Sequence, residues 1–519
     1  MADVEAGLTV QPELVFGLVG PLGTDLSLVA ARLADALTQV RYRSEVFRLS
    51  RLMREIPQEP WSMLCDDFRD VEIEQHIKAG NELRRRLGRK DAVAMLGIGA
   101  LREYRDVQSG DPNKPLTGFA AILQSLKRPE EIETLRRIYG PAFIVLAAYS
   151  PRARRVQDLA RRIAESRYSN QAGQFVSKAE TLVATDEAEV GVPSGQNVRD
   201  SFSLADAIVN VGNVQSLETA INRFIELLFG NTLNTPTRDE QGMYFAHAAA
   251  YRSASLARQV GAAICRRDGS VISVGSNEVA KAGGGQYWCD DDPDGRDFRI
   301  GYDSSDRMRE TLLGDVLDRL KEGGWLAADR SAVATKELVV EALRGTDHPI
   351  MKGAQFTSTI DYVRAVHAEM AAITDAVRHG VPTIGSEMFT TTFLCHDCAK
   401  HIAAAGIQRV VYIEPYPKSL VGEMYPDSIV VDTDIECSGK VRIDPFVGIG
   451  PKRYQDFFAL GRRKRKNKDG TVAAWRRADA VPALPDYMPS VVARLTAEEE
   501  AVKQFENHLR ARVNPTENR

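Results

Sequence analysis

Alternating apolar runs and amphipathic segments over the first 230 residues limit the folds open to this part of the chain. Apolar runs at 13–20 and 142–150 predict buried strands, and the segments 26–39 and 217–230 predict helices. Strands that alternate with helices pair in parallel, because each helix carries the chain back to the same end of the sheet. The sequence therefore predicts an α/β domain with a parallel sheet over residues 1–230.

A polar segment at 231–242 interrupts this pattern and predicts a linker. Strands and helices are mixed again over 243–455, beginning with a hairpin whose turn is Asp268 and Gly269. Residues 456–519 are irregular or charged, so we expect a C-terminal extension there. A chain of 519 residues with 44% hydrophobic content can bury a core in each of two or three domains.

Composition also restricts the location of the protein and its partners. No apolar run approaches the roughly 20 residues of a membrane span, and the N-terminus has no signal-peptide pattern, so we expect a cytoplasmic protein without a membrane partner. The net charge of −4 requires no polyanionic partner. The basic run 462–468 is typical of a solvated loop, and we assign it no function. Six cysteines are too sparse for a disulfide scaffold, so the thiols should be free or bound to metal.

Two of these cysteines, Cys395 and Cys398, have the spacing that allows two thiolates to bind one zinc ion. A structural site would need two further ligands, often a second such pair, and the sequence has none. A thioredoxin-like redox pair would leave His367, at the start of a predicted helix, unexplained. One histidine and two cysteines leave zinc an open position for water, so the pattern predicts a catalytic Zn2+ site.

Glu369 follows the histidine by two residues and lies near the same helix start. It is poorly placed as a fourth ligand but well placed to move protons at a zinc-activated water. The arrangement matches the deaminase pattern H-x-E…P-C-x-x-C, except that Leu394 replaces the proline. The predicted chemistry is hydrolytic deamination with Glu369 as the catalytic residue.

The segments "HAEMAAI", "CHDCAKHIAAAGIQRVVY" and "VGAAICRRDGSVISVGSNE" resemble the zinc-dependent cytidine and deoxycytidylate deaminase family over about 244–455. The resemblance implies a cytidine-deaminase-like α/β/α sandwich and attack of hydroxide on C4 of cytosine. It also implies that Asn277 contacts the sugar of the substrate. Ala280 stands where the family often has proline, which affects the expected conformation of that loop rather than the chemistry.

The segment "GLVGPLGTDLSLVA", at 17–30, lies between a strand and a helix, as phosphate-binding loops do. Started at Gly20, the pattern G-x-x-x-x-G-K-[ST] places Asp25 at its second glycine, Leu26 at its lysine and Ser27 at its hydroxyl. Without the lysine we expect no phosphoryl transfer. Backbone N–H groups at a helix start can still bind a nucleotide, with Gly20, Gly23 and Ser27 as the predicted contacts.

A glycine turn in an unrelated α/β domain is the alternative interpretation of this loop. Any cation that replaced the lysine would have to come from elsewhere, and Arg152, Arg154 and Arg155, after the strand at 142–150, are the nearest candidates by fold analogy.

The segments "IVLAAYSPRARRVQDLARR" and "ADAIVNVGNVQSLETAINRF" resemble nucleotide and nucleoside kinase folds. A degenerate P-loop kinase-like domain joined to a deaminase resembles the bacterial anti-phage dCTP/dCMP deaminases. That resemblance implies conversion of dCTP or dCMP to dUTP or dUMP, which depletes the deoxycytidine nucleotide pool during infection. It further implies a nucleotide or phage-derived effector at the N-terminal domain, an inhibitory small RNA and a homo-oligomer.

Two alternatives stay open at this point. An RNA or DNA editing deaminase uses the same zinc chemistry, but it requires a basic channel with aromatic residues, and the run 462–468 lacks aromatic residues. A regulatory protein with a structural zinc would need no catalytic Glu369.

Overall fold

The structure of the protein is a computed structural model, and the chain it describes falls into two compact units. The first unit comprises the residues up to Glu240 and those from Pro445 onward, and the second comprises Gln241–Asp444. The described residues are 11–64, 67–189, 192–345, 349–351, 354–358, 362–415, 419–432, 439–461, 463–485 and 490–513.

These units differ from the domains expected from sequence in two places. Residues 445–455, expected in the second domain, belong to the first unit. The expected linker 231–242 is helical at its end, because helix α10 (Arg238–Ala250) begins inside it. The short strand β14 (Gly448–Ile449) pairs with β5 (Ala207–Asn210), and this pairing returns the chain to the first unit.

The first unit is built on a parallel sheet, as the alternation of strands and helices predicts. Its strand order is β14-β5-β4-β1-β3-β2, and only β14 is antiparallel to its neighbour. Strand β1 is buried along its whole length, which fits a strand covered on both faces. The other strands of the parallel part are β1 (Leu14–Val19), β2 (Arg43–Arg48), β3 (Phe119–Leu126) and β4 (Phe143–Tyr149).

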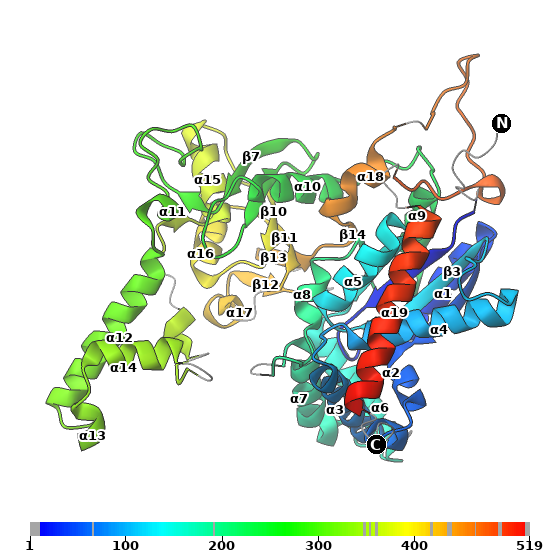
Figure 1. The fold of residues 1–519 in the computed structure, drawn as a ribbon. Coiled ribbons are helices and arrows are strands. Elements are labelled where there is room, and N and C mark those ends of the chain that lie inside the picture. The colour runs from blue at the N-terminus through cyan, green and yellow to red at the C-terminus, as the bar shows by residue number, and fades with distance from the viewer. Residues whose placement is uncertain are drawn as a thin grey trace. The chain divides into compact units, whose positions relative to one another are not determined.

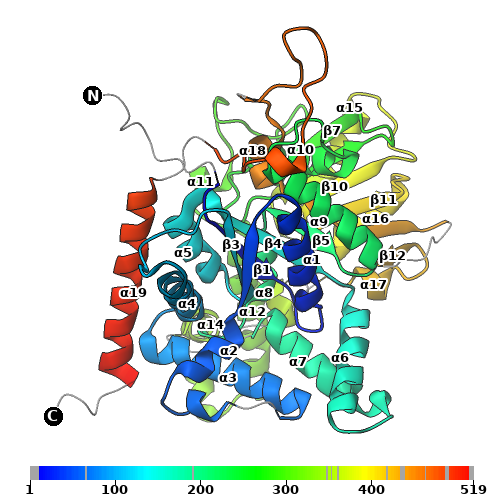
Figure 2. The same ribbon diagram turned by 90° about the vertical axis from the view of Figure 1, so that its right-hand side faces the viewer.

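Helices cover both faces of this sheet (Figure 2). Helices α1 (Leu26–Gln39) and α9 (Val214–Leu228) pack on one face, where Phe16 and Leu18 share a core with Val29 and Ile221. Helices α4 (Ala92–Ser109) and α5 (Pro129–Tyr139) lie on the other face. The remaining helices of this unit are α2 (Leu49–Leu52), α3 (Arg69–Leu87), α6 (Arg152–Ser166), α7 (Val176–Glu187), α8 (Val198–Phe202), α18 (Tyr454–Phe458) and α19 (Val491–Val513).

A buried charge network fixes the C-terminal helix α19 to this unit. The guanidinium of Arg105, on α4, pairs with Glu13 and, at 2.7 Å, with Glu498 of α19. The Tyr139 hydroxyl donates to the other oxygen of Glu498 at 2.7 Å. Buried charges are tolerated only when they are paired and hydrogen-bonded, so α19 is an integral part of the unit.

The second unit has a mixed sheet in the order β12-β13-β11-β10-β6-β7. Strand β10 is parallel to β11 and antiparallel to β6, and β6 and β7 form the predicted hairpin. Helix α15 (Ala368–Arg378) packs on β6 and β7, and α16 (His396–Ala404) packs beside α15 (Figure 1). The strands are β6 (Gly261–Cys265), β7 (Val271–Ser276), β10 (Glu387–Thr392), β11 (Arg409–Glu414), β12 (Ile429–Val431) and β13 (Val441–Pro445).

Helix α10 lies on the other face of this sheet, because Gly242 meets Phe389 of β10 and Gly261 of β6 meets Ala246. The mixed α/β architecture predicted for this part of the chain is therefore confirmed. The segment 297–344 adds α11 (Asp297–Ile300), α12 (Ser304–Glu322), α13 (Ala328–Ser331) and α14 (Thr335–Arg344). In the described part of the chain, no helix combines the length and apolar character needed to cross a bilayer.

Gly275 sets the distance between β7 and α15. A Cβ atom at this position would lie 2.2 Å from the carbonyl oxygen of Ala368 and 2.4 Å from the amide nitrogen of Ala372. Both obstructing atoms belong to the backbone of α15 and cannot rotate away.

We therefore expect Gly275→Ala to displace α15 and to destabilise the protein by about 1–3 kcal/mol, the usual range for an overpacked core. Thermal unfolding followed by circular dichroism would measure this loss. Gly422→Ala is the matched control, because nothing lies within 4 Å of a Cβ at that position. Equal melting temperatures for the two variants would contradict the close approach.

Candidate active site

Three predicted metal ligands come together at the starts of two helices in the second unit. His367 is the N-cap residue of α15, directly after strand β9 (Ala365–Val366). Cys395 is the N-cap residue of α16, and Cys398 lies in the first turn of that helix. One ligand atom from each residue lies within 4.8 Å of the other two, and among the described residues this is the one such group of three or more His, Cys, Asp or Glu side chains.

The distances within this group fit a zinc ion. His367 Nδ1 lies 3.4 Å from Cys395 Sγ and 3.4 Å from Cys398 Sγ. A tetrahedral zinc with ordinary Zn–S and Zn–N bonds places such nitrogen and sulfur ligands about 3.6 Å apart. The donor set of one imidazole and two thiols is therefore suited to Zn2+, and it leaves one coordination position to a non-protein ligand.

Charge at the site favours this interpretation. Hydrogen bonds from Cys398 and His367 lower the pKa of Cys395 to about 4, and the hydrogen bond with Cys395 raises the pKa of His367 to about 9. The interaction with the Cys395 thiolate, together with burial, raises the pKa of Cys398. The metal-free group therefore holds protons that a dication replaces when it binds.

Glu369 lies in the first turn of α15 and is 5% exposed. Its Oε2 atom is 3.6 Å from Cys398 Sγ, which donates to it. Burial raises the pKa of this carboxyl above its ordinary value. A carboxyl with a raised pKa beside a metal site is suited to accept a proton and to return it.

Asn277, the predicted sugar contact, follows β7 and stabilises a neighbouring loop. Its Oδ1 atom accepts from the Val260 amide at 2.7 Å, and its Nδ2 atom donates to the Arg258 carbonyl at 2.8 Å. The contact with a sugar stays a prediction. Leu394, at the position of the expected proline, is buried, and its carbonyl accepts from Ser419 Oγ at 2.7 Å.

The glycine loop predicted to bind phosphate lies in the first unit, between β1 and α1. Gly23 has φ +91°, and a Cβ there would lie 2.6 Å from the Arg155 carbonyl oxygen, so this position needs glycine. Asp25 caps α1 by accepting from the Leu28 amide at 3.0 Å. Ser27 Oγ accepts from Gln124 Nε2 at 3.2 Å.

A lysine that no local sequence pattern indicates lies at this loop. Lys127, directly after β3, donates from Nζ to the Gly20 carbonyl at 3.1 Å. Of the three arginines proposed from sequence, Arg155 also reaches the loop and donates to the Leu22 carbonyl at 3.3 Å. Arg152 and Arg154 instead bind Glu187 and the Gly212 carbonyl. Because Lys127 lies more than 100 positions from the loop in sequence, no local spacing indicates the contact.

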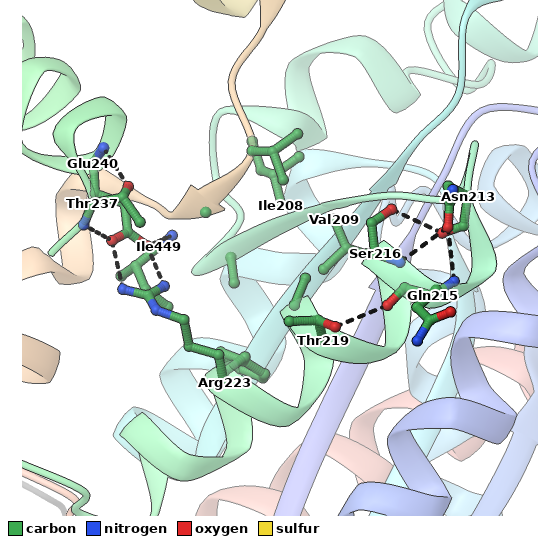
Figure 3. Close-up of a pocket in the computed structure, with 15 residues that line it drawn as sticks. Ile208, Val209, Asn213, Gln215, Ser216, Thr219, Arg223, Thr237, Glu240 and Ile449 are labelled. Atoms are coloured by element: carbon green, nitrogen blue, oxygen red, sulfur yellow. Dashed lines mark hydrogen bonds and ion pairs between the residues drawn. The ribbon is translucent and has the colours of Figure 1, made fainter. Parts of the chain in front are cut away.

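A separate cavity of about 630 Å³ lies between β5, α9 and β14 in the first unit (Figure 3). Its buried carboxylate, Glu240, accepts from Arg223 at 2.7 Å, from the Thr237 amide at 2.7 Å and from the Ile449 amide at 2.8 Å. These bonds satisfy the carboxylate, so we assign it a structural role in joining α9, α10 and β14.

Comparison with known proteins supports the metal site. Residues 236–414 match the model of the cytidine and deoxycytidylate deaminase zinc-binding region. The chain is 47% identical to ComE operon protein 2 of Bacillus subtilis over 53 residues, which cover 10% of this chain and 28% of that protein. It is 46% identical to the deoxycytidylate deaminase of Enterobacteria phage T4 over 57 residues, which cover 11% of this chain and 30% of the phage protein.

Both curated relatives are thus matched over less than a third of their length. A crystal structure of the dCMP deaminase from cyanophage S-TIM5 with dCMP and dUMP aligns with 41% of this chain and 99% of its own, at 18% identity and a TM-score of 0.22. The matched family model describes a zinc-binding region, and the residues that match it include His367, Cys395 and Cys398. Zinc is therefore the cofactor that the match implies, and these three side chains form the described group that could hold it.

Replacing Cys395 by serine should cost the protein its zinc, because a hydroxyl does not replace a thiolate as a zinc ligand. We expect zinc in the purified variant to fall from about one ion per chain to a small fraction, measured by plasma emission spectroscopy. Cys289→Ser is the control, since Cys289 is exposed and outside the ligand group. Full zinc content in Cys395→Ser would refute the ligand assignment.

Proposed function

We propose that the second unit catalyses the hydrolytic deamination of deoxycytidine nucleotides. The single observation that carries this proposal is the buried carboxyl of Glu369 beside three convergent ligand atoms from His367, Cys395 and Cys398. A structural zinc site needs no proton-transfer group and normally has four protein ligands.

A zinc ion with three protein ligands lowers the pKa of water to about 7 and so supplies a nucleophile at neutral pH. Glu369 takes a proton from the attacking water and delivers it to N3 of cytosine. It then takes the second proton, from the hydroxyl on C4, and delivers it to N4, which leaves as ammonia. A C4–O bond forms, the C4–N4 bond breaks, and the product is a deoxyuridine nucleotide. Burial keeps Glu369 away from bulk water and raises the pKa of its carboxyl, which favours the protonated form that each transfer requires.

The substrate class rests on the matched family and on the phage deoxycytidylate deaminases. We propose dCTP or dCMP as substrate, with depletion of the deoxycytidine pool in the cytoplasm as an anti-phage role. The resemblance of the two-domain order to anti-phage deaminases supports this role. It is also the basis for proposing a homo-oligomer, an inhibitory small RNA and a nucleotide or phage-derived effector at the first unit.

The direct test is incubation of the zinc-loaded protein with dCTP, dCMP, single-stranded DNA and single-stranded RNA, with the uracil product quantified by liquid chromatography. We expect turnover of a free nucleotide and none of the polymers. Glu369→Gln should keep its zinc and lose at least about 100-fold in turnover, the usual contribution of a positioned acid–base group.

Glu423→Gln is the matched control, because Glu423, on the short helix α17 (Val421–Met424), is exposed. Deamination of the polymers alone would identify an editing enzyme. Near-normal turnover by Glu369→Gln would overturn the acid–base role, and bound zinc with no turnover of any substrate would indicate a structural metal.

We further propose that the first unit is a kinase-like domain without kinase activity. The parallel sheet and the glycine loop between β1 and α1 support the kinase-like fold, and Leu26 in place of lysine supports the loss of activity. Labelled ATP incubated with each deoxynucleoside or monophosphate should give no phosphoryl transfer, and Leu26→Lys should not restore it, because Asp25 would pair with the new lysine. Transfer above that of a Ser27→Ala variant would contradict this prediction.

A further inference from the structure

The loop after β1 already binds an anion, and that anion belongs to the protein. The Leu22 amide donates to Asp186 Oδ2 at 2.7 Å. The Lys127 ammonium lies 2.8 Å from Asp186 Oδ1 and 3.1 Å from Oδ2. A backbone N–H and a lysine converging on an oxyanion are the groups with which phosphate-binding loops hold phosphate.

Asp186 is placed to remain in this position. It lies near the C-terminal end of α7 and is 2% exposed, and the next residue, Glu187, bonds to Arg155 at 2.6 Å. Arg155 in turn donates to the Leu22 carbonyl at 3.3 Å. Asp186 therefore binds the loop directly, and the adjacent Glu187 binds it through Arg155.

The described lysine and arginine side chains beside the loop are already paired with carboxylates. A cavity of about 170 Å³ adjoins the ion pair, and its described lining includes Arg69, Arg84 and Lys127. Arg69 pairs with Glu72 at 2.7 Å, and Arg84 pairs with Glu131 at 3.2 Å. Since Asp186 neutralises Lys127, a phosphate approaching the loop meets carboxylates and already bonded donors.

The position of this cavity is one at which α/β proteins bind ligands. It lies beyond the carboxyl ends of β1 and β3, which are neighbours in the sheet although β2 separates them in the chain. Ser125, near the end of β3, has φ +80°, which is uncommon for serine.

We propose that the loop after β1 is a phosphate-binding site held shut by Asp186, which acts as an internal substitute for phosphate. The contact is autoinhibitory: a polyphosphate group reaches the Leu22 amide and Lys127 only when the end of α7 withdraws its carboxylate. The ligand class is the polyphosphate group, whether free or part of a nucleotide. This inference concerns the first unit and does not depend on deamination by the second.

Isothermal titration of the full-length, zinc-loaded protein with inorganic tripolyphosphate tests the proposal. We expect little binding by the wild type and affinity at least about 100-fold higher in Asp186→Ala, because a like charge is removed and two donors are freed. Adding Lys127→Met to that variant should abolish the gain. The matched control Asp200→Ala removes an exposed carboxylate from the same unit and should behave as the wild type.

The isosteric Asp186→Asn keeps the shape of the buried side chain and serves if the alanine variant does not fold, as judged by circular dichroism and zinc content. It should bind tripolyphosphate at least about 10-fold more tightly than the wild type, because the negative charge is gone. The gain is smaller than in the alanine variant, because the asparagine oxygen can still accept the hydrogen bond of the Leu22 amide. Repeating the titration with ATP shows whether a nucleotide can supply the polyphosphate. Wild-type binding as tight as that of either variant, or no gain in a folded variant, would overturn the proposal.

Discussion

The start of one helix beside the start of another is the constraint on which the metal centre depends. Helices α15 and α16 pack against each other, and His367 and Cys395 are their N-cap residues. The N-terminus of a helix stabilises negative charge through its free N–H groups, so a thiolate is favoured at this place even without metal. The low pKa of Cys395 comes first from its hydrogen bonds with the Cys398 and His367 side chains, and the 3.4 Å bond from the Cys398 amide to its sulfur, at the helix start, adds to it.

The two buried carboxyls of greatest interest, Glu369 and Asp186, differ in what surrounds them. Glu369 has a thiol as its hydrogen-bond donor, and burial raises its pKa, so it is suited to move a proton. Asp186 has a lysine at 2.8 Å and a backbone amide at 2.7 Å, so it is suited to remain a fixed anion. The same functional group is suited to proton transfer in one environment and to a permanent negative charge in the other.

The features that could be predicted from the sequence are those whose residues lie close together in the chain. His367 and Glu369 begin one helix, and Cys395 and Cys398 begin another, so short patterns reveal which side chains cluster. Helix α1 likewise begins at Leu26 and ends at Gln39, as its apolar periodicity predicts. The contact of Lys127 with Gly20 could not be predicted, because sheet topology alone brings them together. The two-residue strand β14 is too short for a periodic pattern, so the return of 445–455 to the first unit was missed.

The discontinuity of the first unit has a consequence for its synthesis. The chain leaves this unit at Glu240 and re-enters it at Pro445, and Glu498 on α19 completes the buried network of Arg105. Until the ribosome has made helix α19, Glu13 is the one carboxylate partner of Arg105 among the described residues, and Tyr139 lacks the acceptor of its hydroxyl hydrogen. The second unit, by contrast, is continuous and has left the ribosome by then. The buried charge network of the first unit therefore cannot be complete before the segment that carries Glu498 has been synthesised.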